Sequence, residues 1–591
     1  MCGIAGFWLK QPPTSDVAQT RLSAMTSALR HRGPDDSGAW YDGNSGVGLG
    51  HRRLSIVDLS PDGHQPMRSA SGRYTIVFNG EVYNFAELRR ELEQNGMLRG
   101  ALRGHSDTEV MLAAIDAYGL VAAVQKFVGM FAFALWDSET QSLHLVRDRL
   151  GIKPLYLGYS DSGLLFGSEL KALTLAPDFD RRLDLRALSL YAERSCVPAP
   201  LSIYRQAQKL LPGTITTLRS ARANDATTTT YWSATAAATQ GLQNPFRGTD
   251  EEAVDELERQ LLEAVRLRMV ADVPLGAFLS GGIDSSTVVA LMQAQSSQRV
   301  RTFSIGNETA AYDESGAARA VAEHLGTDHR SLVVSGRDAL DVVPMLPQMF
   351  DEPFADPSQI PTYLVSRLAR GHVTVALSGD GGDELLGGYN RHLWGPRVWR
   401  AVAPVPLLAR RVVAGWLTSL RPEHWDRVFA RLPFLPHIRL PGHQVHKLAR
   451  VLDVCSPQEL YRRLCSQWNG DIVRGGQVGS APQPLLEDAS AQMMLTDTLT
   501  YLPDDILTKV DRASMAVALE ARVPILDHRV VELAWRLPQR LKINRGQGKW
   551  VLRQILQLYV PQRLIERPKM GFQIPVGDWL RGPLRPWAED L

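Results

Sequence analysis

Short apolar runs separated by turn residues characterise the first 218 residues of the chain. Runs bounded by glycine, proline or aspartate and rich in β-branched and aromatic residues are typical of strands, and they occur at 72–84, 129–148 and 164–173. Helical spacing of apolar positions that ends at a glycine occurs at 87–96 and 108–119. The pattern predicts an α+β domain over residues 1–218, with stacked antiparallel sheets and helices outside them.

The pattern changes twice further along the chain. Residues 219–248 are small, polar and without a sustained period, which predicts a linker and surface loop. From residue 249 an apolar stripe with helical spacing begins, formed by Val254, Leu257, Leu261, Leu262 and Val265. Strand-like runs then alternate with helix-like runs, which predicts an α/β domain over 249–591 built on a parallel sheet flanked by helices. Within it, residues 390–495 look mostly helical and carry no recognisable chemistry.

Composition narrows the class of protein. The chain has 591 residues, a formal net charge of +2 and dispersed Lys and Arg residues, so two or more domains and no nucleic-acid partner are expected. The four cysteines show no C-x-x-C spacing, which argues against a disulfide framework or a zinc knuckle. The first residues lack the features of a secretory signal and no apolar run is long enough to span a membrane. The expectation is a cytoplasmic enzyme.

Cys2 follows the initiator methionine directly. Removal of that methionine would place an α-amine, with an ordinary pKa near ~8, beside the thiol, where it can act as general base. The alternative is an incidental buried cysteine, which for a lone residue is the commoner case. Cys2 alone does not decide between them.

Four further motifs lie in the same domain, at 30–38, 51–60, 78–84 and 104–109. Together with Cys2 they closely resemble the glutaminase domain of the N-terminal-nucleophile amidotransferases, over about the first 210 residues. The resemblance implies binding of the glutamine carboxylate by Arg53, a pocket lining at Val57, oxyanion donors at Asn79 and Gly80, and binding of the α-ammonium by Glu81 and Asp107. Asn79-Gly80 taken alone is the strongest short signal for a type I′ hairpin turn; joined to Cys2 and Arg53 the pair favours the glutamine site, and the two interpretations are compatible.

A second candidate site follows an apolar strand at 276–291. Gly281 and Gly282 let the backbone approach a polyanion, and a helix N-terminus adds partial positive charge. Hydroxyl donors accompany them at Ser280, Ser285 and Ser286. Asp284 repels phosphate, so its sensible role is to hold Mg²⁺. The loop lacks the lysine of a Walker A sequence.

This loop resembles the pyrophosphate loop of ATP pyrophosphatases, which cleave ATP between the α and β phosphates. A similar loop at 377–389 also follows an apolar strand. The resemblance implies ATP contacts at Ser378 and Gly379, nucleotide borders at Leu279 and Ile305, and metal binding by Asp383 with Asp284. A calcium-type acidic turn is the alternative for the second loop, but its spacing does not match that of an EF-hand.

The two motif sets together resemble glutamine-hydrolysing asparagine synthetase, in a longer bacterial form, and segments 507–528 and 548–556 extend the match. The resemblance implies ammonia transfer to an acyl-adenylate of aspartate, with ATP and Mg²⁺, catalytic roles for Asp380 and Lys549, and a dimer. A surface lysine is the bland alternative for Lys549. Asp380 stands where well-known members carry Glu, and 351–367 also departs from their sequence, so another carboxylate, such as a nucleotide-linked uronic acid or a cell-wall precursor, remains an alternative acceptor.

Overall fold

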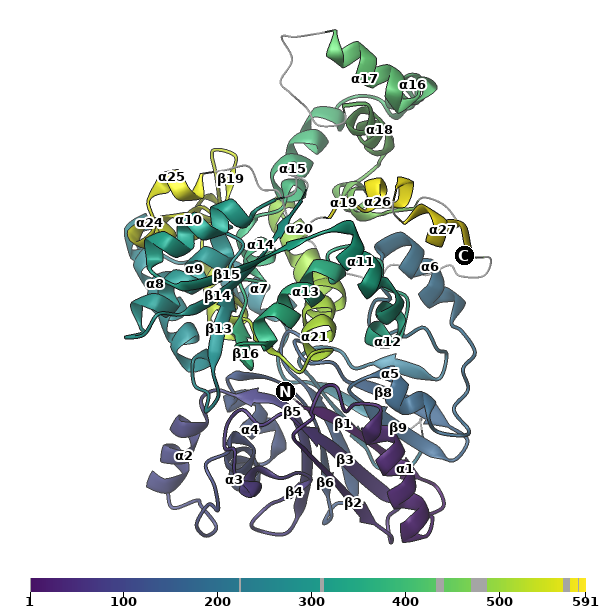
Figure 1. The fold of residues 1–591 in the computed structure, drawn as a ribbon, viewed down its shortest axis with the longest axis vertical. Helices are drawn as coiled ribbons and strands as arrows, with labels where there is room; N and C mark the ends of the chain where they lie inside the picture. The colour runs from purple at the N-terminus through teal and green to yellow at the C-terminus, as the bar shows by residue number, and fades with distance from the viewer. Residues whose placement is uncertain are drawn as a thin grey trace.

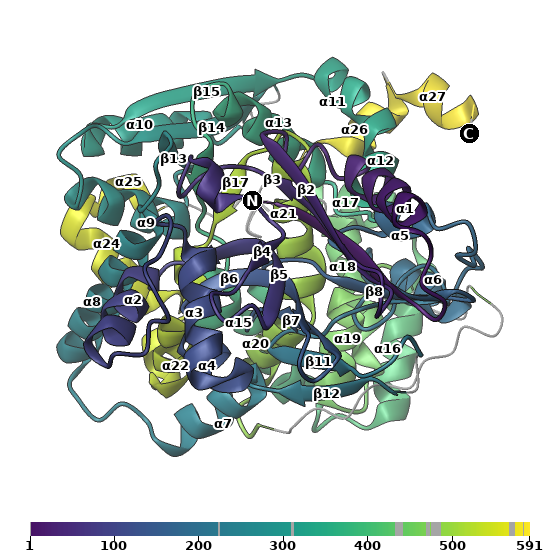
Figure 2. The same ribbon diagram turned by 90° about the horizontal axis from the view of Figure 1, so that it is seen from below.

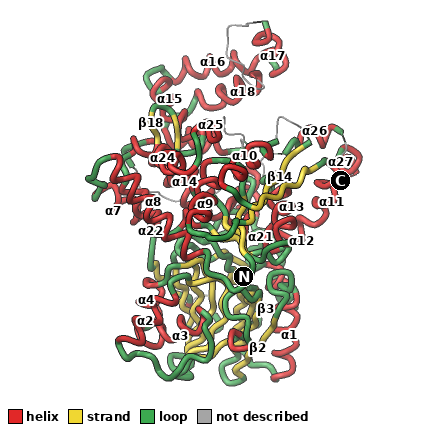
Figure 3. The backbone as a smooth tube through the Cα atoms, turned by 60° about the vertical axis from the view of Figure 1, so that its left-hand side comes forward, coloured by secondary structure: helices red, strands yellow, loops and turns green. Residues whose placement is uncertain are grey.

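A computed structural model gives the fold of the chain, and it describes residues 2–222, 225–308, 313–431, 441–468, 473, 486–566, 574–582 and 584–590. Two bodies are stacked along the long axis of the molecule, with the N-terminal domain below and the C-terminal domain above (Figure 1). Strands dominate the lower body and helices the upper one (Figure 3). Among the described helices, none combines the length and apolarity that crossing a membrane requires.

Two six-stranded sheets form the N-terminal domain, and all of their strand pairs are antiparallel. The first sheet has the order β10 (Ala207–Lys209), β8 (Tyr156–Ser160), β9 (Gly163–Gly167), β1 (Gly3–Leu9), β3 (Val47–Arg53) and β2 (Asp36–Asp42). The second has the order β12 (Thr227–Thr230), β11 (Thr214–Leu218), β7 (Ser142–Arg147), β6 (Gly129–Asp137), β5 (Tyr74–Val82) and β4 (Met67–Arg68). Figure 2 shows the first sheet lying across the second.

Helices cover the outer face of each sheet. Helices α1 (Ser15–Ser27) and α5 (Leu170–Thr174) pack on the first sheet, and α2 (Phe85–Gln94), α3 (Asp107–Tyr118) and α4 (Leu120–Lys126) lie over the second. Between the sheets, apolar side chains such as Ile4, Trp8, Val77 and Trp136 form a separate core. The expected αββα layering of an N-terminal-nucleophile fold is therefore confirmed.

Residues 219–248 are not the linker and surface loop that their composition suggests. Four threonines form β12, because β-branched side chains suit an edge strand beside β11. Helix α7 (Ala234–Gln243) packs on α22 (His528–Arg536) of the other domain. Gly241 permits this contact, since a Cβ there would lie 2.7 Å from the carbonyl carbon of Trp535. A low-complexity sequence here encodes a close-packed small-residue face.

A five-stranded parallel sheet organises the C-terminal domain, as expected. Its order is β15 (Asp328–Val334), β14 (Arg301–Asn307), β13 (Leu275–Phe278), β16 (Val375–Leu377) and β17 (Glu520–Arg522). One face carries α8 (Asp250–Arg268), α9 (Ile283–Ala294), α10 (Ser315–Leu325) and α24 (Trp550–Tyr559), and the other carries α13 (Gln359–Arg370) and α21 (Leu507–Met515). The apolar stripe predicted from residue 254 lies on α8, which begins with a capping box between Thr249 and Glu252.

The described parts of 390–495 are mostly helical. They comprise α15 (Asn390–Val402), α16 (Leu407–Ser419), α17 (Pro422–Ala430), α18 (Pro441–Leu452), α19 (Pro457–Cys465) and α20 (Ala489–Leu499). Helices α16 to α18 project from the top of the molecule, whereas α15, α19 and α20 return to the parallel-sheet body (Figure 1).

Helix α21 joins the two domains through buried charges. Arg32 donates to the Asp511 carboxylate at 2.8 and 3.1 Å and, through Nε, to the Cys2 carbonyl oxygen at 3.1 Å. The next residue of α21, Arg512, pairs with Glu169 at 2.9 Å. These groups are at most 3% exposed. Because breaking a buried pair leaves an uncompensated charge, such contacts fix the position of α21 against the N-terminal domain.

Candidate active sites

Cys2 lies buried at the start of β1, at the edge of the domain interface. Its backbone N donates to Asn79 Oδ1 at 3.0 Å. Burial raises the pKa of the Cys2 thiol, while the nearby Arg53 guanidinium opposes that rise. A thiol with a raised pKa needs a base to become a nucleophile.

Asn79 and Gly80 lie in the middle of β5, paired with β6, so the hairpin-turn interpretation is wrong. Glycine is required within the strand here, because Gly80 has φ +152° and a Cβ would lie 2.1 Å from the carbonyl oxygen of Met130. The Asn79 side chain is fully buried, and its Nδ2 has no hydrogen-bond partner among the described residues. A buried donor without a partner next to Cys2 is suited to an oxygen that becomes negative during reaction.

Arg53 ends β3 on the same side as Cys2. Its Nη1 donates to the Ser60 carbonyl at 3.0 Å and its Nη2 to the Asp58 carbonyl. Gly63 leaves room for this guanidinium, because a Cβ there would lie 1.8 Å from Nη2. Val57, half-buried, packs against the core of the C-terminal domain.

Glu81 and Asp107 supply a buried pair of carboxyl groups near Cys2. Asp107 Oδ2 accepts from the Val82 backbone at 2.9 Å, and Glu81 lies 3.6 Å from Arg522 of β17. Burial raises the pKa of Asp107 to about 6, and burial followed by Glu520 and Asp107 raises that of Glu81 well above its ordinary value. Such a pair is stabilised by an added cation such as an ammonium group.

The second site lies at the carboxyl ends of β13 and β16, which are adjacent in the sheet. This edge is where open α/β sheets bind ligands. A cleft of about 2110 Å³ opens there and extends to α15, α19 and α20. The predicted residues that line it are Ser280, Gly281, Gly282, Asp284, Ser285, Ser378, Gly379, Asp380, Asp383 and Lys549.

The two loops are in close contact. Ser280 Oγ accepts from the Gly282 backbone at 3.2 Å and lies 3.0 Å from Ser285 Oγ. Gly281 has φ +70°, and a Cβ on Gly379 would lie 2.6 Å from the backbone N of Ser285. These glycines bring both backbones to the start of α9, whose N-terminal N–H groups suit an anion.

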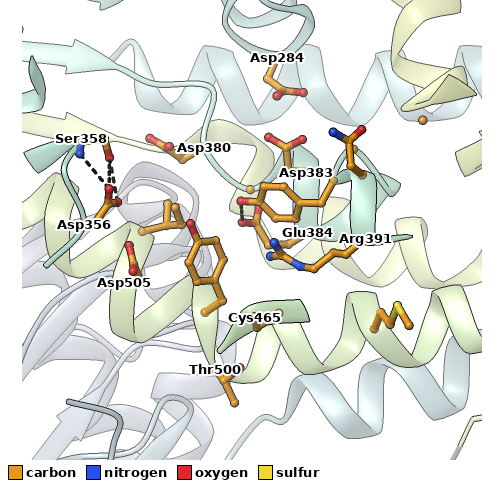
Figure 4. A pocket seen from close by; sticks show the side chains of 18 of the residues that line it. Asp284, Asp356, Ser358, Asp380, Asp383, Glu384, Arg391, Cys465, Thr500 and Asp505 are labelled. Carbon is orange, nitrogen blue, oxygen red and sulfur yellow. Dashed lines mark hydrogen bonds between the residues drawn. The ribbon is translucent and has the colours of Figure 1, made fainter. Parts of the chain in front are cut away.

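Lys549 occupies the centre of this site, immediately before α24, and is 6% exposed. Its Nζ pairs with Asp383 at 2.8 Å and also with Asp284. Burial by itself lowers the pKa of Lys549, but the two carboxylates more than offset it and keep the amine charged. The surface-lysine interpretation is wrong. Figure 4 shows Asp284 and Asp383 facing each other across the cleft, with Asp380 beside them.

Three predicted nucleotide contacts do not reach the cleft wall. Leu279 and Ser286 are buried behind the loop, and Ile305 packs into the apolar core below it. Asp380 does reach the wall, where Ser378 Oγ donates to its carboxylate. Burial raises the pKa of Asp380.

Sequence reasoning missed a second group of charged residues in the cleft. Lys509 pairs with Asp356 at 2.7 Å, and Glu384 accepts from the Tyr389 hydroxyl at 2.6 Å. Arg391, from the helical region that offered no chemistry, also lines the cleft. Asp356 and Glu384 lie within the segments 351–367 and 377–389, where neighbouring acidic residues are the available clue. Arg391 offered none, because its partner Asp497 is 106 positions away.

Asp284 and Asp383 are the two residues predicted to bind a metal ion. No cluster of three or more potential metal-ligating side chains occurs among the described residues. The two carboxylates nevertheless both contact the Lys549 ammonium group, and neighbouring glycines leave room for them. A Cβ on Gly382 would lie 2.3 Å from Asp284 Oδ1, and one on Gly388 would lie 2.1 Å from Asp383 Oδ1. Paired carboxylate oxygens of this kind are suitable ligands for Mg²⁺.

Comparisons with known proteins agree with the two-domain architecture. The sequence model of the glutamine amidotransferase domain family matches residues 1–232, and that of the asparagine synthase family matches residues 256–591. Asparagine synthetase [glutamine-hydrolyzing] 1 of Bacillus subtilis is 34% identical over 600 aligned residues, covering 100% of this chain and 90% of that protein. A putative asparagine synthetase [glutamine-hydrolyzing] of Mycobacterium tuberculosis is 36% identical over 608 residues, with the same coverage.

A glutaminase domain joined to an ATP-dependent synthase domain defines a glutamine-dependent carbon–nitrogen ligase. The chain belongs to the family of glutamine-hydrolysing asparagine synthetases. That family uses ATP as co-substrate.

Proposed function

We propose that the chain forms asparagine from aspartate, glutamine and ATP, in the cytoplasm and as a dimer. The observation that supports this most directly is the placement of Lys549 between Asp284 and Asp383, at the edge where the two glycine-rich loops meet. This arrangement suits negative charge that develops on a phosphate. The N-terminal domain adds a nucleophilic cysteine, Cys2, close to its interface with the C-terminal domain.

In the first reaction, the Cys2 thiol attacks the side-chain amide of glutamine. Loss of Met1, which lies outside the described residues, would turn the Cys2 nitrogen into an amine held by Asn79 Oδ1, where it can take the thiol proton. Asn79 Nδ2 then donates to the oxyanion. Arg53 holds the α-carboxylate, Glu81 and Asp107 hold the α-ammonium, and ammonia leaves before water releases glutamate.

In the second reaction, a β-carboxylate oxygen of aspartate attacks the α-phosphorus of ATP. Pyrophosphate leaves, and Lys549 stabilises the negative charge that builds on the α-phosphate. Ammonia then attacks the acyl carbon, AMP leaves, and Asp380 accepts the proton that the new amide nitrogen loses. Its burial favours this role because the raised pKa makes the carboxylate a better base.

Asp284 and Asp383 would hold Mg²⁺. The ion would neutralise charge on the pyrophosphate oxygens. The contact of both carboxylates with Lys549 supports the assignment, since they already share one cation.

Product analysis tests the proposed function. Purified protein with glutamine and ATP is expected to form AMP and pyrophosphate only when aspartate is added, and asparagine should appear in equal amount. A parallel screen of other carboxylic acids, including uronic acids, measures specificity. Aspartate-independent AMP formation, or ADP in place of AMP, contradicts the proposal.

Glutaminase activity is expected to fall at acid pH. Because the pKa of Asp107 is raised to about 6, the carboxylate becomes protonated below that pH and no longer attracts the glutamine ammonium. The kcat/KM for glutamine should then decline about tenfold per pH unit. In Asp107→Asn the value should be low throughout and lack the inflection near pH 6, so that the only acid limb left is the one set by the Cys2 amine. An unchanged acid limb in the variant would assign it to another group.

A further inference from the structure

Arg391 is held in one orientation at the wall of the cleft. Its Nε and Nη2 each donate to Asp497 at 2.9 Å. The guanidinium carbon lies 3.9 Å from the ring centroid of Tyr389 and 5.0 Å from that of Tyr501. The side chain is 20% exposed, toward the cleft that it lines. A guanidinium fixed in this way loses little freedom when it binds a ligand.

Part of this cation is available to a ligand. Among the described residues, Nη1 of Arg391 has neither a hydrogen-bond acceptor nor an ion-pair partner. Asp497 does not neutralise it fully, because the same carboxylate also binds His392 Nε2 at 2.6 Å and the Tyr461 hydroxyl at 2.5 Å. Because the side chain lines the cleft, this donor remains for a hydrogen bond to a ligand bound there.

The two lysines of the cleft are committed elsewhere. Lys549 pairs with Asp284 and Asp383, and Lys509 pairs with Asp356, which Ser358 also contacts (Figure 4). Arg391 pairs instead with Asp497 and takes no part in either of these ion pairs. It belongs to α15 and binds α20, whereas the loop suited to phosphate lies at the start of α9.

Buried carboxyl groups that line the cleft suggest that the ligand also carries a positive charge. Glu384 lies beside it in Figure 4 and is 1% exposed. Asp505, on the same cleft, is 3% exposed and its Oδ1 has no hydrogen-bond partner among the described residues. A cation close to buried carboxyl groups complements the carboxylate and ammonium of an α-amino acid.

We propose that Arg391 selects the acceptor by binding its α-carboxylate. The proposal rests on the proposed function, which takes aspartate as the acceptor, and assigns recognition of its α-carboxylate to Arg391. Discrimination arises because an acceptor without the α-carboxylate leaves the fixed guanidinium unpaired in a partly buried site.

The test compares aspartate with 3-aminopropanoate, which keeps the reacting carboxylate and lacks the other. Wild-type enzyme is expected to prefer aspartate about 100-fold or more in kcat/KM. Arg391→Gln should raise the KM for aspartate about 100-fold, leave the KM for ATP within about twofold, and reduce the preference for aspartate nearly to one. Arg391→Lys should lie between, because it keeps the charge without the fork.

Arg462→Gln is the matched control. This arginine also lines the cleft, but its side chain is 56% exposed and its ion pair with Glu193 is long, at 3.9 Å. Little change is therefore expected. A wild-type enzyme that uses both acceptors equally would overturn the proposal without any variant. An equal loss with both acceptors in Arg391→Gln, or a raised KM for ATP, would assign Arg391 to folding or to ATP binding.

The test separates this proposal from the proposed function. Wild-type enzyme that forms no AMP with aspartate contradicts the proposed function. Normal turnover of aspartate with an unchanged KM in Arg391→Gln contradicts only the role of Arg391. Glutaminase activity, measured in each variant, reports whether the N-terminal domain remains folded.

Discussion

Cys2→Ala protein is expected to lose glutamine-dependent synthesis and to retain synthesis from added ammonium. Alanine provides no nucleophile, so glutamine hydrolysis should fall at least about 10⁴-fold. The cleft proposed to bind ATP is formed without Cys2, so AMP formation with ammonium and aspartate should stay within about twofold of wild type. Glutamate release and AMP formation, measured on the same preparation, check both parts.

Cys455→Ala is the control for this experiment, because Cys455 is an exposed free thiol outside both sites. It should behave as wild type in both assays. If glutamine still drives synthesis in Cys2→Ala protein, the thiol mechanism is wrong. If ammonium-dependent synthesis is lost as well, Cys2 also supports the structure of the interface.

Lys549→Met is expected to have the opposite effect. Removing the ammonium group takes away a charge that suits the α-phosphate, which typically costs about 10²- to 10³-fold in kcat. It also leaves Asp284 and Asp383 without their shared cation, so ATP binding should weaken. Glutamine hydrolysis should continue, because Cys2 and its neighbours lie in the other domain. Pyrophosphate release and glutamate release are the two measurements.

Lys542→Met tests whether the loss of any buried lysine would have the same effect. Lys542 is 1% exposed, and its Nζ lies over the Trp535 ring at 4.6 Å, outside the cleft. Burial lowers its pKa to about 7, so replacement by an apolar side chain should be tolerated. Equal losses in the two variants would argue against a specific role for Lys549.

The sequence predicts most readily what is local. The loop around Asp284 was recognisable because strand, glycines and helix follow one another within a few residues, and adjacent parallel strands then bring Asp383 to the same edge. Lys549 and Asp284 are 265 positions apart in the sequence, so only the family resemblance predicts that Lys549 belongs to this site.

Local patterns misled where tertiary contacts decide the outcome. Asn79-Gly80 has the sequence of a turn but lies within a strand, because pairing with β6 extends through it. The threonine- and alanine-rich segment 219–248 has no clear period, yet an edge strand and the partner α22 give it structure. Arg391 could not be found because its environment is assembled from helices far apart in the chain.

Helix α21 has a consequence for engineering this family. Its residue Lys509 lines the cleft. Two positions later, Asp511 forms an ion pair with Arg32, which donates a hydrogen bond to the carbonyl oxygen of Cys2. An N-terminal domain taken from a relative would therefore pack against an α21 whose charged residues match the original domain and not the new one. Chimaeras that exchange the first domain should also exchange α21, so that the buried ion pairs between this helix and the N-terminal domain are kept.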